Sequence, residues 1–344
     1  MNFLDYSEII VRIILSTIGV AVFGIVFGLF YKGIDRKISA HMQGRIGPPI
    51  VQPFRDVRKL FTKENVIPEN AVPWIFNLIP LVGLIGTITI LLYLPLGGFS
   101  PLISGSGDLI LILYLLIIPS LALVIGGFSS GSPYAVVGAQ REMATMIAYE
   151  FPLAIIIISL AWKLTQLGGA NVFALSTIAA TPIWNNVSGP LGFIGFIILL
   201  IVLIIVTPAE LSKIPFDAPE AETEIAGGLL VEYSGRNLAM FYLTDSVKTV
   251  VMASIIVVLF FPYNISGYIA GIGTYGAYVI DILFYLFKVF LVILFSVTLI
   301  RVAIARLKID QIVYTYWIPL TLLSLVGLIF IMWDGFIMNL LGMT

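Results

Sequence analysis

The chain has 344 residues, of which 60% are hydrophobic and 11% charged, and its mean hydropathy of +1.08 is typical of a polytopic membrane protein. A formal net charge of −1 gives no reason to expect nucleic acid as a partner. With no cysteine and one histidine, His41, the sequence excludes thiolate-held iron–sulfur clusters and argues against histidine-rich metal sites in this chain.

Eight apolar segments are long enough to cross a bilayer core of about 30 Å as helices. They are Ile9–Tyr31, Trp74–Leu94, Leu109–Phe128, Met143–Trp162, Gly192–Pro208, Leu238–Phe261, Val279–Ile300 and Ile312–Trp333. We therefore expect an all-α polytopic membrane protein with eight transmembrane helices, forming a single membrane domain over residues 1–344. The first segment has no basic region or cleavage site before it, so we expect a retained span and not a signal peptide.

Basic residues are concentrated in the odd-numbered connections between these segments. Connections 1, 3, 5 and 7 hold 14 of the 18 lysines and arginines. The positive-inside rule then predicts that these connections are cytoplasmic and that both termini lie outside the cell membrane.

The first connection, about residues 32–73, contains more than a simple turn. Gly44 to Pro49 has too much glycine and proline to be helical. In the following segment, Phe54, Val57, Leu60 and Phe61 recur at helical spacing, with Arg55, Arg58 and Lys59 turned away. We expect a short amphipathic helix at the membrane surface, which either binds lipid headgroups or docks a peripheral protein.

Two glutamates lie in or beside the fourth span. Glu150 is followed by Pro152, which removes a backbone donor and is expected to open the helix locally. Glu142 lies two turns earlier, near the cytoplasmic end. Charged side chains inside a membrane cost at least about 2.5–3.5 kcal/mol at a helix centre, so such residues are functional candidates.

The strongest signal is the acidic connection at about residues 208–237, together with the helix that follows it. Thr207 to Asp245 carries seven carboxylates in 39 residues: Glu210, Asp217, Glu220, Glu222, Glu224, Glu232 and Asp245. The pattern predicts a helix start with Asp217 near the cap and with Glu220 and Glu224 on one face. Asp245 and Lys248 lie at i,i+3 spacing inside the sixth span, which allows them to pair.

Two interpretations of this acidic connection are open. It is a solvated acidic loop whose glutamates favour a helix N-terminus, or it is a coupled set of carboxylates in a poorly hydrated cavity that passes protons or binds a cation. Small and apolar residues between the acids and the scarcity of nearby cations favour the second. In the seventh span, Asp281 and Lys288 share a face, and a structural pair is favoured there over a second ion path.

Several linked motifs resemble the H-type membrane subunit of respiratory complex I and of the related energy-converting membrane-bound [NiFe] hydrogenases. The first connection carries Gln43-Gly44-Arg45-Ile46-Gly47-Pro48, Gln52-Pro53, Asp56 and Lys59-Leu60, and the fourth span carries Tyr149-Glu150. The acidic connection carries Glu210, Pro215-Phe216-Asp217, Pro219-Glu220-Ala221-Glu222, Glu224 and Glu232-Tyr233-Ser234-Gly235, in the family's order and spacing.

The resemblance implies a coupling subunit that joins a peripheral redox arm to membrane-embedded ion pumps. The implied ion path comprises Glu142, Glu150, Glu210, Glu220, Glu222, Glu224 and Glu232, to which we add Asp217, Asp245 and Lys248. The implied contact with the peripheral arm comprises Arg45, Gln52, Asp56 and Lys59. This chain would bind no cofactor and have no catalytic redox centre, since iron–sulfur clusters and a [NiFe] centre belong to partner subunits. Antiporter-like ion-pump subunits and the lipid bilayer are the other expected neighbours.

Departures from the complex I pattern indicate the branch. Only three residues separate Pro48 from Gln52, a compact form that resembles the hydrogenase branch and its sulfur-reducing relatives, and Lys213 and Asp245 stand where complex I usually has arginine and glutamate. We therefore favour a ferredoxin-fed hydrogenase-like complex. The alternatives are the quinone-chamber subunit of an NADH or deazaflavin:quinone oxidoreductase, the equivalent subunit of a membrane-bound sulfur reductase, a structural anchor, or a free-standing ion-coupled transporter. The transporter is disfavoured because the acids occupy only one half of the chain.

Overall fold

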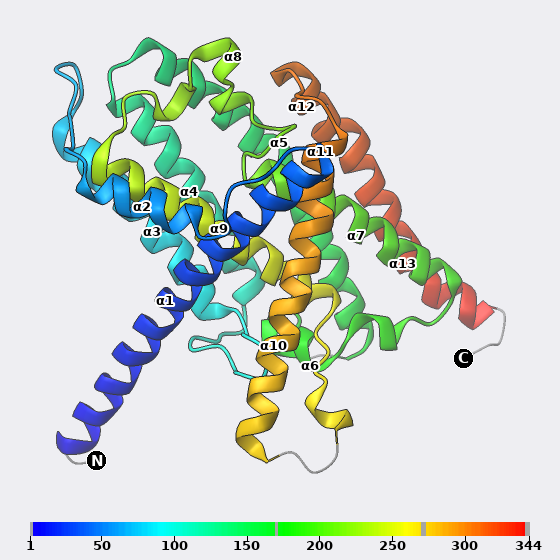
Figure 1. Ribbon diagram of the computed structural model, residues 1–344. Helices are drawn as coiled ribbons and strands as arrows, with labels where there is room; N and C mark the ends of the chain where they lie inside the picture. The colour runs from blue at the N-terminus through cyan, green and yellow to red at the C-terminus, as the bar shows by residue number, and fades with distance from the viewer. Residues whose placement is uncertain (1–2, 169–170, 270–272, 341–344) are drawn as a thin grey trace.

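The computed structural model describes residues 3–168, 171–269 and 273–340 (Figure 1). Within these ranges the regular structure is helical, apart from one isolated bridge between Leu96 and Phe99. Among the described residues, eight helical segments are long and apolar enough to cross a membrane. The expected all-α polytopic fold is therefore confirmed.

Six spans are single helices: α1 (Phe3–Met42), α3 (Pro73–Tyr93), α4 (Asp108–Ser129), α5 (Pro133–Gln166), α7 (Pro190–Glu210) and α9 (Gly235–Phe260). The last two contain a one-turn π-helix each, where the regular hydrogen-bond ladder is interrupted. The seventh span consists of α10 (Thr274–Ile293), the π-helix Leu294–Thr298 and α11 (Leu299–Ala303). The eighth consists of α12 (Ile309–Thr315), the π-helix Tyr316–Leu320 and α13 (Thr321–Leu340). The shorter helices are α2 (Gln52–Thr62), α6 (Leu175–Ala180) and α8 (Glu222–Ile225).

Helix α1 continues beyond the predicted end of its span, so the first connection begins at residue 43 and not at 32. The helix ends in a Schellman motif, in which Gly44 has a φ of +70° and the Arg45 amide donates to the Ala40 carbonyl at 2.8 Å. The added turns carry Lys32, Asp35 and Arg36, whose charges find partners on other elements. The prediction ended the span at Tyr31 because it relied on hydropathy, and the charged residues begin at Lys32.

The amphipathic helix is confirmed as α2, but its apolar side packs onto protein. Val57 is buried in a cluster with Leu29 of α1 and Leu243 of α9. Arg55, Arg58 and Lys59 are exposed, as expected, while Phe61 is 51% exposed and lies outside this cluster. Packing against α1 and α9 thus accounts for Phe54 and Val57 of the apolar stripe, but not for Phe61.

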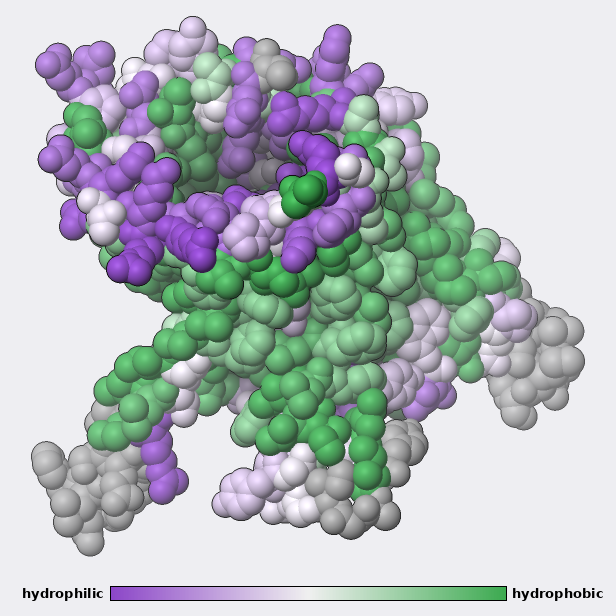
Figure 2. Space-filling model, in the orientation of Figure 1, coloured by the Kyte–Doolittle hydropathy of each residue, from purple (hydrophilic) through white to green (hydrophobic). Residues whose placement is uncertain are grey.

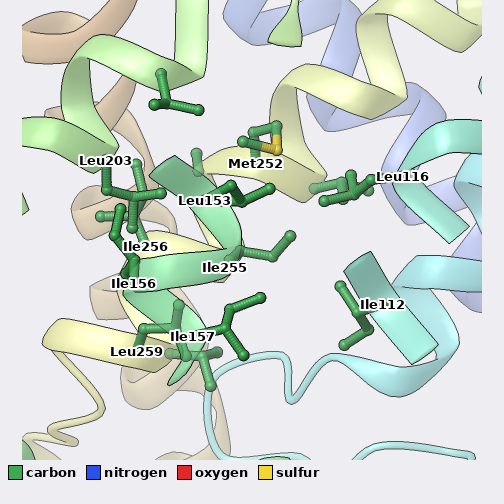
Figure 3. Packing of buried hydrophobic residues seen from close by; sticks show 14 of the residues in the cluster. Ile112, Leu116, Leu153, Ile156, Ile157, Leu203, Met252, Ile255, Ile256 and Leu259 are labelled. Carbon is green, nitrogen blue, oxygen red and sulfur yellow. The ribbon is translucent and has the colours of Figure 1, made fainter. Parts of the chain in front are cut away.

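Helix α9 is the centre of the bundle and is almost wholly buried. It is surrounded by α1, α2, α3, α7 and α10. Its C-terminal half belongs to the apolar core seen in Figure 3, in which Met252, Ile255, Ile256 and Leu259 meet aliphatic side chains of α4, α5 and α7. Its middle turns carry Asp245 and Lys248, so one helix joins the core to the charged region.

Polar side chains gather at one end of the bundle. Figure 1 shows α2, α8 and the α11–α12 connection at the upper end of the molecule, whereas α1 begins and α13 ends at the lower side. In Figure 2 the hydrophilic surface covers this upper end and the surface below it is mainly hydrophobic. The expectation that the odd-numbered connections share one face is confirmed.

Candidate functional site

A cavity of about 260 Å³, lined by charged and apolar side chains, lies below the charged end of the bundle, bordered by α1, α4, α9 and the connection after α7. Its charged lining comes from α1 and from the consecutive segment formed by α7, the connection after it and α9. It comprises Lys32 and Arg36 of α1, Glu210 of α7, Lys213 and Glu220 of the connection, and Asp245 and Lys248 of α9. The structure therefore brings together four members of the predicted ion path, the three carboxylates and Lys248, with three cations that were not predicted to be there.

Asp245 is held by two lysines. Lys32 Nζ lies 2.6 Å from Asp245 Oδ2, and Lys213 Nζ lies 2.7 Å from both carboxylate oxygens. The Lys32 ammonium also sits 3.3 Å from the centre of the Tyr242 ring, a cation–π contact. The contact between Asp245 and Lys248 that i,i+3 spacing allows is not formed, because Lys248 points toward Glu210 of α7 and Ser120 of α4.

Lys248 forms the deepest charged contact of the site. Its Nζ lies 2.9 Å from Glu210 Oε1 and donates to Ser120 Oγ at 2.9 Å. Ser120 Oγ is in turn 3.2 Å from the Tyr149 hydroxyl. Glu210, Lys248, Ser120 and Tyr149 are all buried, so four helices meet in one hydrogen-bonded group.

The two glutamates of α5 lie next to this group. Glu142 is 1% exposed, and its Oε2 accepts a hydrogen bond from Ser212 Oγ at 3.3 Å. One carboxylate oxygen each of Glu142 and Glu150 is buried without a hydrogen-bond partner among the described residues. Pro152 lies inside α5, which runs unbroken through that residue.

A second cavity of about 200 Å³ adjoins the first and shares Lys32, Lys213 and Glu220 with it. Here Asp217 pairs with Arg306 at 2.9 Å and Asp35 with Arg301 at 3.0 Å. Burial raises the pKa of the Asp217 carboxyl, and the Arg306 guanidinium opposes this without cancelling it. Burial also raises the pKa of the Glu220 carboxyl, with the Lys213 ammonium as the strongest opposing charge.

The acidic connection is not the continuous helix that the spacing predicted. A 3₁₀ turn over Ala218–Glu220 is followed by extended backbone at Ala221 (φ −61°, ψ 99°) and only then by α8. Asp217 makes no capping hydrogen bond, because its carboxylate binds Arg306. Glu220 and Glu224 consequently do not share a helix face.

The remaining acids of the connection lie away from the first cavity. Glu222 is exposed and borders the second cavity. Glu224 pairs with Arg141 of α5 at 2.5 Å and is 43% exposed at its side chain. Glu232 is half-buried and lines neither cavity. The geometry thus concentrates the candidate path on Glu142, Glu150, Glu210, Glu220 and Asp245, with Asp217 and Lys248 beside them.

The predicted contact residues of the first connection fall into two groups. Asp56 pairs with Arg36 at 3.0 Å and accepts from Gln52 Nε2 at 3.0 Å, so both are engaged within the chain. Lys59 is exposed. Arg45 is exposed, bonds Gln43, and lines an open pocket of about 420 Å³ that also includes Arg36 and Arg301.

Sequence reasoning missed several members of the site. These are Lys32, Asp35 and Arg36 of α1, Ser120 of α4, Lys213, and Arg301 and Arg306 near α11. The first three lie at i, i+3 and i+4 directly after an apolar span, and this helical spacing is the one signal that could have placed them on a continuing helix. The others become visible only when the helices are assembled.

Asp281 and Lys288 do not pair directly in the described structure, contrary to expectation. Asp281 accepts from the amide and hydroxyl of Ser266, at 2.9 and 2.7 Å. Lys288 Nζ donates to the carbonyls of Phe261 and Tyr263, each at 2.8 Å. Both residues fasten the connection that follows α9.

This arrangement suits proton movement and charge coupling. Carboxylates, hydroxyls and ammonium groups follow one another from the charged end toward the middle of α5 and α9, beside water-sized space. Within the described ranges, no group of three or more histidine, aspartate and glutamate side chains is placed to hold a metal ion.

Comparisons with known proteins extend over most of the chain. Residues 15–332 match the family model described as NADH dehydrogenase. The chain is 32% identical over 322 residues to the H subunit of NADH-quinone oxidoreductase from Syntrophotalea carbinolica, covering 88% of this chain and 90% of that protein. A solved structure of the membrane-bound sulfane sulfur reductase, an archaeal respiratory membrane complex, contains a similar chain. It has a TM-score of 0.79 and 27% identity, over 92% of this chain and 99% of the other.

Proposed function

Because this chain belongs to the NADH dehydrogenase family, as an H-type membrane subunit of the complex I-like group, we propose that it couples electron transfer to ion translocation. Electron flow in a peripheral arm changes charge or shape at the first connection and at the acidic connection. The carboxylates respond by moving protons or sodium ions. The chain itself carries no redox centre in this proposal.

One observation carries the proposal: a row of charged groups, most of them lining one cavity, extends from the charged end into the bundle. It begins at Arg36 and Asp56, continues through the Asp245 lysine pair and Glu220, and ends at Glu210, Lys248 and the glutamates of α5. Burying charged groups at such depth costs free energy, so charged groups that are kept there are expected to have a function. Below the row, the apolar layer of Figure 3 keeps water out.

We further propose that the complex is fed by ferredoxin and reduces a soluble acceptor, as a hydrogenase-like or sulfur-reducing enzyme. The compact first connection supports this, and so does the likeness to a sulfane sulfur reductase chain. Its partners would be peripheral subunits that hold iron–sulfur clusters and the active-site metal, together with antiporter-like ion-pump subunits.

The quinone-chamber function is the second candidate, favoured by the relative that is named as part of an NADH-quinone oxidoreductase. The pocket nearest the first connection has a mixed lining, in which the guanidinium groups of Arg36, Arg45 and Arg301 lie among apolar residues such as Ile46, Pro48 and Ile214. An isoprenoid quinone tail bound there would desolvate these charged groups, which is costly. Reduction of a short-chain quinone by the purified complex, lost on substituting Arg45, would establish the quinone function instead.

Ion uptake into vesicles tests the coupling role. Glu142→Gln and Glu150→Gln keep the side-chain shape but cannot carry a proton. The complex should assemble and transfer electrons in the presence of an uncoupler, while ion uptake falls about tenfold or more. Glu69→Gln, at an exposed position outside the row, is the matched control. Full ion uptake by both α5 variants would refute the proposal.

The charged end is proposed to face the cytoplasm, with both termini outside the cell membrane. Since the chain has no cysteine, single cysteines at Arg58 of α2 and at Tyr275 of α10 can report the side directly. A membrane-impermeant thiol reagent added to intact cells should label the Tyr275→Cys variant alone. Sizing of solubilised membranes separates the coupling subunit from a free-standing transporter, which would migrate without partners.

A further inference from the structure

Most charged groups around the two cavities are paired one to one in the described structure. Four pairs have contacts of 2.9 to 3.0 Å: Glu210–Lys248, Asp217–Arg306, Asp35–Arg301 and Arg36–Asp56. Asp245 instead has two cations, Lys32 at 2.6 Å and Lys213 at 2.7 Å. One lysine would neutralise the Asp245 carboxylate, so the second lysine leaves an excess positive charge beside it.

Glu220 is the carboxylate shared by both cavities, and it lacks a cation. It has no ion pair within the described part of the chain. The charges that act on it come from α1, α5, α9 and its own connection. Lys213 and Lys32 attract its ionised form, while Asp245, Asp217 and Glu142 repel it. Lys213 is the strongest attractor of Glu220, and both line the same two cavities.

The two lysines on Asp245 differ in how firmly their ammonium groups are held. Lys32 is fixed between the Asp245 carboxylate and the face of the Tyr242 ring. Lys213 has its backbone anchored, since its amide donates to the Pro208 carbonyl at 2.8 Å and its carbonyl accepts from Phe216 at 2.7 Å. Its side chain is bound at Asp245 only, and a lysine ammonium is a point charge on a flexible stem. It can move without a change in the backbone.

We propose that Lys213 is a switch residue whose ammonium moves from Asp245 to Glu220 when Glu220 loses its proton, and returns when Glu220 regains it. Lys32 stays on Asp245 throughout, so neither carboxylate is left without a cation. In the present structure Lys213 lies on Asp245, which corresponds to protonated Glu220. The inference rests on the proposed function, because it gives the acidic path a step that links proton uptake to the position of a charge on the connection.

Infrared difference spectroscopy of the purified complex tests the switch, because it follows the protonated Glu220 carboxyl directly. The band that disappears in Glu220→Gln identifies the group, and its pH midpoint is the readout. Lys213→Met removes the cation that stabilises ionised Glu220, so the midpoint should rise by about one pH unit or more. Asp245→Asn removes a repelling anion and frees Lys213, so the midpoint should fall. Lys63→Met, at an exposed lysine outside the cavities, should leave it unchanged.

Lys213→Arg separates a switch from a structural tie. A guanidinium binds a carboxylate through a two-pronged contact and is always charged. It should keep the complex assembled but stay on Asp245, where its charge still attracts Glu220 from a distance, so the midpoint should rise by less than in Lys213→Met. An unchanged midpoint in Lys213→Arg or in Lys213→Met would overturn the proposal. The measurement uses the resting complex, so its result does not depend on whether the complex pumps ions.

Discussion

The ion pair between Glu210 and Lys248 offers a quantitative test of the buried row. Their side chains are 2% and 6% exposed, and the charged atoms lie 2.9 Å apart. With an effective dielectric constant of about 20, two unit charges at this separation attract by about 6 kcal/mol. Removing one partner leaves the other charge buried, which costs about 3–5 kcal/mol. The Ser120 hydroxyl, 2.9 Å from Lys248 Nζ, recovers only part of this.

We expect strong coupling in a double-mutant cycle. Lys248→Met and Glu210→Gln should each lower the thermal stability of the solubilised complex severely. The double variant buries no net charge, so it should be more stable than either single variant and closer to the unaltered protein. The assay is the fraction of this chain retained in the complex after heating, measured for all four proteins under one set of conditions.

The refuting result is additivity. If the double variant loses as much stability as the two single variants together, the two side chains do not interact in a dry site. Ion uptake gives a second readout, because the stabilised double variant still lacks a carboxylate that can carry a proton. Its uptake should stay low while its assembly recovers.

Three further predictions concern packing, capping and pH. In Gly28→Ala a Cβ would lie 2.5 Å from the Ser246 carbonyl oxygen of α9. This overpacking should lower the stability of the protein by about 1–3 kcal/mol, as measured by thermal unfolding. Gly19→Ala, which has open space around it, should leave the stability unchanged or raise it slightly. Asp334 accepts hydrogen bonds from the amides of Ser188, Gly189 and Gly192 at 2.9–3.1 Å. Asp334→Asn should therefore lower the stability of the protein by about 1–3 kcal/mol. Asp310→Asn, at an exposed position, should leave the stability unchanged. The raised pKa of Glu220 means that its contribution to stability is fully present below the pKa of an unfolded glutamate and is lost as pH rises through the folded pKa. Glu220→Gln should therefore be the more stable protein above that pH and gain nothing in acid; a constant difference across pH would contradict this.

The helical architecture and the location of the acidic residues could be inferred from sequence because both depend on local composition. A run of about 20 apolar residues must satisfy its own backbone hydrogen bonds in a bilayer, and a helix is the way a single segment does so. Basic residues in alternate connections indicated the relative orientation of the spans. The amphipathic stripe of α2 could likewise be predicted from the sequence, but the helices that it packs against could not.

The pairing of charges depends on how the helices assemble. Asp245 and Lys248 are close in sequence, and i,i+3 spacing permits their contact, yet the first binds lysines of α1 and the connection and the second binds Glu210. Local spacing sets which contacts are possible, but in a poorly hydrated interior each charge takes the partner that best repays its lost hydration. That partner can lie on any helix of the bundle, as with Lys32 and Asp245, 213 residues apart. Composition and spacing thus indicate which charges lie near the membrane, and the packing of α1, α7 and α9 determines which of them meet.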